Sequence, residues 1–260
     1  MHGEASELVA GDRVNSEALA ISRHSISTDR VDLNISERDG MLQGNREHYF
    51  RVGRGALAAV QTVASMWGNN EFESILDFGC GHGRVLRWLR AAYPNAELVA
   101  SDILDDGVAF CAEAFVATPW LATIDIETLN ASKRFDLIWA GSVITHLPEK
   151  STQALLNKFV SWLRPGGIAV FSSHGRTALR KQGHRPFDYF AGGNQTAAIG
   201  GYYRDGYGYA DYPNLTGYGC SFIRVDWLWR FLEGNPDVDL VSVTEAAWDF
   251  HQDVVSVKRV

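Results

Sequence analysis

A glycine-rich turn between a strand and a helix limits this chain to few folds. Residues 75–83 read ILDFGCGHG, an apolar run followed by Gly79, Gly81 and Gly83 at alternating positions. The apolar run predicts a buried strand, and an amphipathic helix is predicted at residues 83–93. Glycine permits backbone conformations and close approaches that a Cβ atom prevents. The turn therefore offers the free N–H groups of a helix start to an anionic ligand.

Strand and helix patterns alternate on both sides of this turn. Strands are predicted at residues 74–78, 97–101, 121–124, 135–140 and 168–172, and helices at 47–68, 83–93, 105–115 and 149–163. Such alternation is typical of an α/β fold, a doubly wound and mostly parallel sheet with helices on both faces. Ligands bind such sheets at the carboxyl ends of the strands. Two further strands, at 238–244 and 248–257, are predicted to form an antiparallel edge hairpin.

The length of 260 residues suits one domain with an elaboration. Residues 1–44 are polar without a sustained period, which predicts an arm preceding a domain at 45–260. Residues 175–236 interrupt the alternation with a glycine- and tyrosine-rich insertion that contains a short helix around Trp227. An insertion of this length predicts a binding loop or lid.

The net charge and the cysteine content exclude several classes of function. The net charge of −7 gives no basic field for a phosphate backbone, so no nucleic-acid partner is expected. The three cysteines form no C-x-x-C pair, which argues against a disulfide framework and a cysteine zinc site. No secretory signal is read, and the most apolar run, residues 137–147, is too short to span a membrane. A cytoplasmic protein is therefore expected.

Acidic residues follow the first three predicted strands. Asp77 could face an ammonium group, and Asp102 could accept both hydroxyls of a ribose. Asp125 and Ile126 could hold the edge and face of an adenine. A dinucleotide fingerprint would space its glycines G-x-G-x-x-G, whereas this turn reads G-x-G-x-G. Glycines alone would equally suit an ordinary tight turn.

With the turn at residues 163–167 before the fifth strand, these motifs resemble the class I S-adenosylmethionine-dependent methyltransferases. The resemblance implies a sheet order of 3-2-1-4-5-7-6 with strand 7 antiparallel, and S-adenosylmethionine as the cofactor. The residues expected to bind it are Tyr49, Asp77, Gly79, Cys80, Gly81, Gly83, Arg84, Asp102, Ile103, Asp125, Ile126, Ala140 and Ser142.

A narrower similarity points to the acceptor. Residues 77–84, 141–147, 173–176 and 251–254 are similar to bacterial methyltransferases of unassigned substrate, some near cell-surface glycan genes. This similarity implies a small-molecule or glycan hydroxyl as acceptor.

Three histidines are expected at one rim of the sheet. His146 follows the fourth strand, His174 ends the fifth, and His251 lies near the start of the antiparallel strand. Imidazole titrates near neutrality, so each is a candidate base, with His146 preferred. Taken singly, each histidine could equally be structural. Period two places Asp249, His251 and Asp253 on one strand face, where the carboxylates could orient the histidine or help bind a metal. No metal site is predicted, because no tight ligand spacing is present.

The insertion supplies candidate acceptor contacts. Tyr207, Tyr209 and Tyr218 are interleaved with glycines and, with Asp253, are expected to contact the acceptor. Packing as a rigid surface loop is the alternative for these tyrosines.

The expected function is therefore O-methylation with a histidine base. Alternatives are an N-methyltransferase, a binding module for S-adenosylmethionine without chemistry, and an NAD-dependent oxidoreductase, which the glycine spacing disfavours. The oligomeric state is not predicted.

Overall fold

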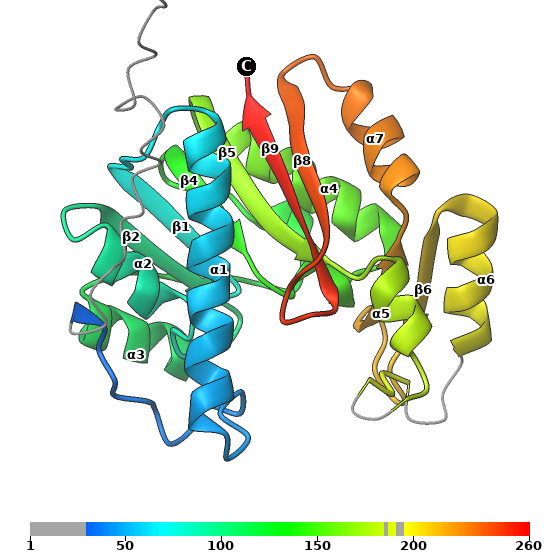
Figure 1. Ribbon diagram of the computed structural model, residues 1–260, viewed down its shortest axis with the longest axis horizontal. Coiled ribbons are helices and arrows are strands. Elements are labelled where there is room, and N and C mark those ends of the chain that lie inside the picture. The colour runs from blue at the N-terminus through cyan, green and yellow to red at the C-terminus, as the bar shows by residue number, and fades with distance from the viewer. Residues whose placement is uncertain (1–29, 185–186, 191–194) are drawn as a thin grey trace, which may run out of the picture.

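The computed structural model describes residues 30–184, 187–190 and 195–260, and it shows a seven-stranded sheet between two layers of helices (Figure 1). The strand order is β3-β2-β1-β4-β5-β9-β8, and β9 runs antiparallel to both of its neighbours. The expected order and the antiparallel strand are confirmed. The last two strands carry higher numbers only because the insertion contains a separate two-stranded sheet, β6-β7.

The strands are β1 (Ser74–Phe78), β2 (Glu97–Asp102), β3 (Thr118–Leu121), β4 (Phe135–Ala140), β5 (Leu163–Ser173), β6 (Tyr207–Asp211), β7 (Gly219–Ile223), β8 (Val238–Trp248) and β9 (Gln252–Arg259). The helices are α1 (Arg46–Met66), α2 (Leu86–Ala92), α3 (Asp105–Phe115), α4 (Glu149–Trp162), α5 (Arg176–Lys181), α6 (Gln195–Asp205) and α7 (Val225–Glu233).

Two apolar cores lie on opposite faces of the sheet. Helices α1, α2 and α3 pack on one face, where Ile75 of β1 lies. Helices α4 and α7 pack on the other, where Leu76 and Phe78 of the same strand lie. All five residues of β1 are buried, which is why this strand reads as a continuous apolar run.

One predicted strand boundary and one predicted strand face are wrong at the edges of the sheet. Strand β3 lies at Thr118–Leu121 rather than at 121–124, because this mostly exposed edge strand pairs with β2 and needs no apolar pattern. The expected common strand face of Asp249, His251 and Asp253 is also wrong. Asp249 and Phe250 have positive φ values of 47° and 58° in the turn between β8 and β9, and β9 begins only at Gln252.

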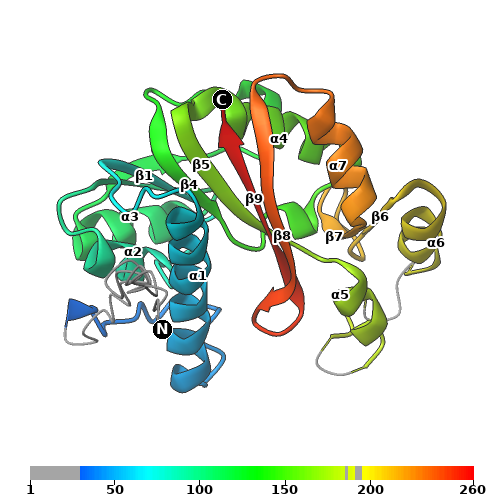
Figure 2. The same cartoon turned by 45° about the horizontal axis from the view of Figure 1, so that its top comes forward.

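The insertion is built of regular structure rather than irregular loop. Helices α5 and α6 and the β6-β7 hairpin share a third apolar core, and they gather to one side of the sheet (Figures 1 and 2). A Cβ atom on Gly208 would collide with the carbonyl oxygen of Ala198 in α6. The glycines in this segment therefore let helix α6 lie directly on strand β6.

Arg87 fastens residues 30–44 to the sheet domain. Its guanidinium is almost completely buried and donates to the carbonyl oxygens of Gly83, Asp32 and Asn34 at 3.0, 2.9 and 2.7 Å. The rest of the predicted polar arm, residues 1–29, lies outside the described residues. Among the helices of the described ranges, none is long and apolar enough to cross a membrane.

Arg87→Met should lower the free energy of unfolding by about 2–4 kcal/mol, because buried carbonyl oxygens lose charged donors. Denaturant titration measures this change, and limited proteolysis should show faster cleavage within residues 30–44. Arg54→Met, at an exposed position of α1, is the matched control. Equal stability of the two variants would show that Arg87 does not fasten the segment.

Candidate functional site

The glycine turn is held by the end of the neighbouring strand. The carbonyl oxygen of Ser101 in β2 accepts the N–H groups of Gly79 and Cys80 at 2.7 and 3.0 Å. The Asp102 carboxylate accepts the N–H of Gly81 at 2.7 Å. The turn is thus fixed in place before any ligand binds.

The three glycines of the turn meet different surroundings, although all have positive φ values of 82°, 50° and 79°. A Cβ atom at Gly79 would collide with Val143, and one at Gly83 would collide with Phe115. A Cβ atom at Gly81 would meet no atom within 4 Å. Gly79 and Gly83 are therefore needed for packing, whereas Gly81 faces open space where a ligand could lie against the backbone.

Asp77 carries a deeply buried carboxyl group. The residue is 1% exposed, and its Oδ2 atom forms no hydrogen bond with any residue in the described ranges. Burial and the nearby Asp102 raise its pKa to about 8, against the opposing effect of Arg84. A buried polar atom without a partner costs free energy. A cationic group placed beside Asp77 would remove that cost.

Arg84 follows the turn and lies close to Asp77. Its guanidinium stands over the ring of Trp248, 5.7 Å from the centroid, and burial lowers its pKa. Within the described ranges, no carboxylate forms an ion pair with it. An anionic group next to the cation-binding Asp77 would therefore find a counter-charge in Arg84.

Asp102 and Ile103 end β2 beside the turn. The second carboxylate oxygen of Asp102 accepts the N–H of Leu104 at 3.1 Å. A carboxylate has about four acceptor positions, so Asp102 retains capacity for two hydroxyl donors. Ile103 is 51% exposed and presents an apolar surface next to it.

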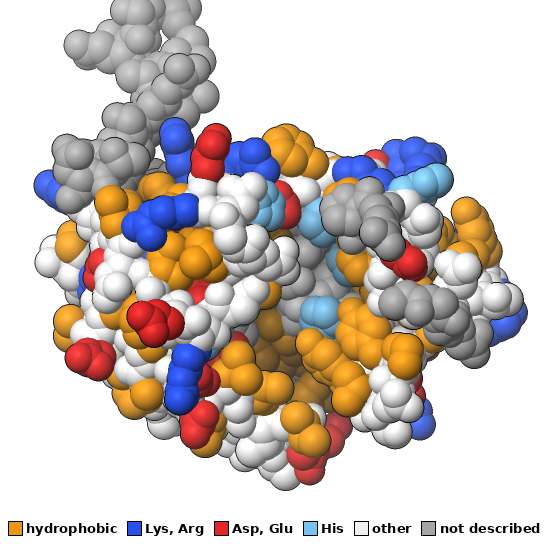
Figure 3. Space-filling view, turned by 90° about the horizontal axis from the view of Figure 1, so that it is seen from below, with side chains coloured by type: hydrophobic (Ala, Val, Ile, Leu, Met, Phe, Trp, Pro, Cys, Tyr) orange, Lys and Arg blue, Asp and Glu red, His pale blue; other side chains and the backbone are white. Residues whose placement is uncertain are grey.

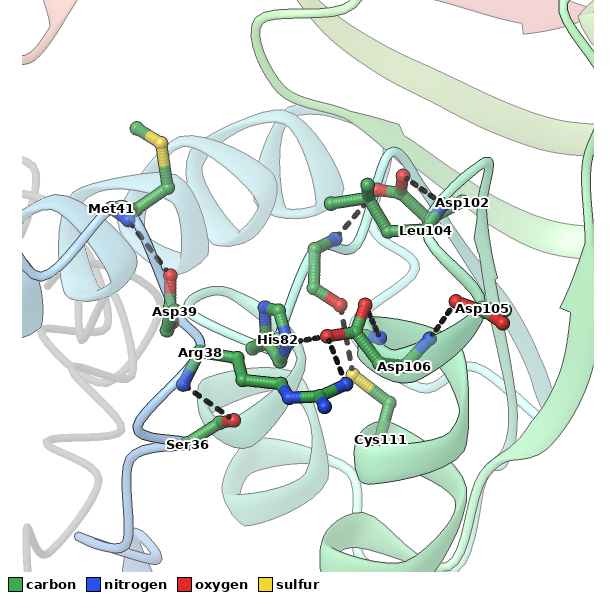
Figure 4. Close-up of polar contacts among 12 residues, drawn as sticks. Ser36, Arg38, Asp39, Met41, His82, Asp102, Leu104, Asp105, Asp106 and Cys111 are labelled. Atoms are coloured by element: carbon green, nitrogen blue, oxygen red, sulfur yellow. Dashed lines mark hydrogen bonds and ion pairs between the residues drawn. The ribbon is translucent and has the colours of Figure 1, made fainter.

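A cluster at the start of α3 connects the turn to residues 30–44 (Figure 4). The Oδ2 atom of Asp106 lies 3.3 Å from Nη1 of Arg38 and 3.5 Å from Nε2 of His82. His82 belongs to the glycine turn and is buried. Residues 30–44 are therefore tied directly to the neighbourhood of the turn.

Three of the expected cofactor contacts occupy other positions. Tyr49 is fully buried and donates its hydroxyl to Asp39, so its ring is enclosed under residues 30–44. Ile126 is 8% exposed and packs in the core with Phe78, which removes the apolar face expected for adenine. Asp125 is exposed and caps a short 3₁₀ helix, η3 (Ile126–Thr128), by accepting the N–H of Glu127.

The end of β4 is linked to β5 and β9 through side chains. Ala140 is buried, and Ser142 has a positive φ of 60°, a conformation that costs a non-glycine residue free energy. The N–H of Ser142 donates to Oγ of Ser172 at 2.7 Å. Gln252 bonds both serines, accepting from Ser172 at 2.6 Å and donating to Ser142 at 3.2 Å. These bonds fix the three strand ends that border the histidines.

The three predicted histidines do come together. The ring centroids of His174 and His251 are 5.8 Å apart, and the charge of His146 contributes to the pKa of His174. Figure 3, seen from the carboxyl ends of the parallel strands, shows histidine side chains along a hollow in this face. Sequence reasoning placed them correctly because the order of strands determines which ends meet.

His146 is held in one tautomer. It ends the short 3₁₀ helix η4 (Ile144–His146), and its Nδ1 atom lies 3.0 Å from the carbonyl oxygen of Gly219 in β7. Because a carbonyl only accepts, Nδ1 carries the proton, and the Nε2 atom of the neutral ring keeps its lone pair. Burial lowers the pKa of His146, which favours this neutral form. The ring stacks on Tyr218 with centroids 4.9 Å apart.

His174 and His251 are more enclosed. Burial, with His251 and His146 nearby, lowers the pKa of His174 well below its usual value. His251 bonds the carbonyl oxygen of Asp249 through Nδ1 at 2.7 Å, and burial lowers its pKa as well. Asp249 itself bonds Nε2 of His48 in α1 at 2.9 Å, so its carboxylate does not orient His251 as expected.

Two of the expected acceptor contacts are enclosed. Tyr207 is 4% exposed, and its hydroxyl bonds Thr152 and the carbonyl oxygen of Leu147. Asp253 is buried against Gly175, and burial raises its pKa to about 6. The interior positions of both side chains contradict the predicted contact with an acceptor.

Tyr209 and Tyr218 lie nearer the surface. Tyr209 bonds Asp211 of its own strand, whereas Tyr218 covers His146 and is 43% exposed. Tyr218 is thus the predicted tyrosine that borders the histidines.

Two further tyrosines lie beside the histidines. The Tyr212 hydroxyl lies 3.1 Å from Nδ1 of His146, and the Tyr189 ring centroid lies 4.6 Å from that of His174. Tyr212 belongs to the tyrosine-rich part of the insertion that the sequence indicates as an acceptor surface, whereas Tyr189 was missed and only the tertiary structure identifies it. Within the described ranges, no group of three or more histidine, cysteine, aspartate or glutamate residues could hold a metal ion.

The known proteins that this chain is similar to are methyltransferases. Residues 76–169 match the methyltransferase domain family. Malonyl-[acyl-carrier protein] O-methyltransferase 2 of Ilyobacter polytropus is 28% identical over 110 residues, 42% of each chain. Trans-aconitate 2-methyltransferase of Methylobacterium radiotolerans is 34% identical over 95 residues, 36% of this chain and 35% of the relative. The chain thus spans less than half the length of these curated relatives.

Solved structures share the fold over most of the chain. An S-adenosylmethionine-dependent methyltransferase from Clostridium acetobutylicum superposes with a TM-score of 0.57 at 14% identity, covering 85% of this chain and 95% of the other. The N-methyltransferase NodS from Bradyrhizobium japonicum, in complex with S-adenosyl-L-homocysteine, gives 0.53 at 16% identity, covering 86% and 93%. Residues 76–169 are therefore similar to a methyltransferase domain, and the chain shares the fold of these solved methyltransferases.

Proposed function

We propose that the chain is an S-adenosylmethionine-dependent methyltransferase that binds its donor over the glycine turn. The observation that carries this proposal is the buried, unpartnered carboxylate of Asp77 beside the open backbone at Gly81. The methionine part of S-adenosylmethionine would supply an ammonium group for Asp77 and a carboxylate for Arg84. Asp102 would accept the ribose hydroxyls, while Ile103 would contact the adenine.

When bound, S-adenosylmethionine supplies a methyl group activated by a sulfonium. The protein must then align the acceptor and take up its proton. Alignment alone can contribute roughly 7–11 kcal/mol to such a reaction. A hydroxyl acceptor gains further from a base, which typically contributes about 10²- to 10⁴-fold.

His146 is the proposed base for a hydroxyl acceptor. Its neutral tautomer leaves Nε2 free to accept a proton, and the carbonyl oxygen of Gly219 stabilises the imidazolium that results. His174 is too deeply buried to carry charge easily, so we assign His174 and His251 to shaping the acceptor site. The relatives include both O- and N-methyltransferases by name. The fixed neutral base favours a small-molecule hydroxyl, under a cap formed by residues 175–236.

Asp102→Asn should weaken binding of S-adenosylhomocysteine by at least about 10-fold, since hydrogen bonds to a charged acceptor contribute about 1.5–3 kcal/mol each. Isothermal titration calorimetry measures the affinity, and thermal unfolding monitors the turn that Asp102 also supports. Asp239→Asn, on the exposed edge of the sheet, should bind as the wild type does. Unchanged affinity in Asp102→Asn would exclude the ribose contact.

Binding of S-adenosylhomocysteine at pH 7 should release close to one proton. With a pKa of about 8, Asp77 is mostly protonated in the free protein at this pH, and the ligand's ammonium group would hold it ionised. Calorimetry in two buffers of different ionisation enthalpy measures the release. Asp77→Asn should lose both the release and much of the affinity. Binding without proton release by the wild type would contradict the contact.

His146→Gln should lower kcat by about 10²-fold or more for every hydroxyl acceptor that the wild type methylates, with unchanged affinity for S-adenosylhomocysteine. Because the pKa of His146 is lowered, the acid limb of the wild-type rate profile should lie below pH 6.5. His184→Gln, at an exposed position, is the control. Near-wild-type turnover by His146→Gln would remove His146 from the role of base.

A further inference from the structure

Tyr189 lies at the centre of an aromatic wall formed with Phe187, His174 and His251. It belongs to residues 187–190, between α5 and α6, and its N–H donates to the side-chain oxygen of Gln182 at 3.1 Å. Its ring centroid is 4.6 Å from that of His174 and 6.5 Å from that of His251. The ring of Phe187 continues the wall, 4.9 Å from His251.

The hydroxyl of Tyr189 is the unusual feature of this wall. It is buried and has no hydrogen-bond partner among the residues that the structure describes. Buried hydroxyl groups in proteins nearly always form a hydrogen bond. A buried hydroxyl without one, next to a candidate site, therefore indicates that a ligand supplies the partner. Burial raises the pKa of Tyr189, and the charges of Cys220 and Tyr212 raise it further. The group is therefore a neutral donor, and its pKa responds to Tyr212, whose hydroxyl bonds His146.

The other polar side chains at this wall already have partners. Asp249 bonds His48, and Asp253 accepts the N–H of Ala246. Gln252 uses its amide on the two serines that link the strand ends. A sugar would bring several hydroxyls, each costly to bury without a partner. A flat ring that stacks on aromatic side chains and carries few polar groups matches this wall better.

We propose that the Tyr189 hydroxyl holds the acceptor, and that the acceptor is an uncharged aromatic ring bearing a hydroxyl group. This inference rests on the proposed methyltransferase function, since it concerns the acceptor side of the same site. Tyr189 would bind a polar substituent of the ring, while His174, His251 and Phe187 contact its faces and edges. The hydroxyl to be methylated would then lie on the side of Tyr212 and His146.

The test uses 4-nitrophenol, a flat hydroxylated ring whose absorbance reports binding and ionisation, at a pH below its own pKa so that the probe is uncharged. The protein is first titrated with S-adenosylhomocysteine and then, once saturated, with 4-nitrophenol. Failure of the first titration would count against the proposed function. Failure of the second alone would overturn only the aromatic acceptor.

The matched variants are Tyr189→Phe and Tyr203→Phe, each of which loses only a hydroxyl. Tyr203 is 67% exposed in α6 and serves as the control. Tyr189→Phe should weaken 4-nitrophenol binding by about 3- to 10-fold, as expected for one neutral hydrogen bond. Tyr203→Phe should leave binding unchanged, and both variants should bind S-adenosylhomocysteine as the wild type does.

A competing sugar probe distinguishes the two acceptor classes. Methyl β-D-glucopyranoside should not displace 4-nitrophenol from the saturated protein. Displacement by the glucoside, or equal 4-nitrophenol affinity in Tyr189→Phe and the wild type, would overturn the proposal.

Discussion

The hydrogen bonds between the glycine turn and the end of β2 are the constraint on which the site depends. Ser101 and Asp102 together bind three consecutive N–H groups of the turn, so strand pairing and ligand geometry are set by the same residues. Because the turn cannot move away from β2, the open backbone at Gly81 stays close to the carboxylates of Asp77 and Asp102. The donor site is therefore organised by the Ser101 carbonyl oxygen and the Asp102 carboxylate before a ligand binds, so little further entropy is lost in ordering it.

The two halves of the site differ in their electrostatics. The donor half contains acidic and basic groups: Asp102, Arg84, and Asp77, whose raised pKa leaves it mostly protonated until a cation lies beside it. The acceptor half contains neutral rings, because burial lowers the pKa of each of its three histidines. A zwitterionic donor suits the first environment and an uncharged acceptor suits the second. Under the proposed function, the donor and the acceptor would therefore bind in distinct regions of the site.

Local patterns explain how much could be predicted from the sequence. Strand β1, the turn and α3 follow from apolar runs, glycines and helix periodicity, all of which act between near neighbours in the chain. The pairing of strand ends then brought His146, His174 and His251 together, as the alternation predicted. The insertion at residues 175–236 was predicted, but most of its regular structure was not, because its glycines serve the contact between α6 and β6 and give the segment the composition of a loop. Tyr189 was not predicted for the same reason, because its proposed role depends on the rings of His174 and His251, and that of His251 is distant from it in the sequence.

The carbonyl oxygen of Gly219 gives the insertion a part in the chemistry as well as in acceptor binding. The proton on Nδ1 of His146, and hence the lone pair on Nε2, depends on an atom of the β6-β7 hairpin. Exchanging this hairpin for another, in evolution or in the laboratory, would alter base strength together with acceptor choice. A redesigned cap that accommodates a new acceptor must therefore also return a hydrogen-bond acceptor to this position.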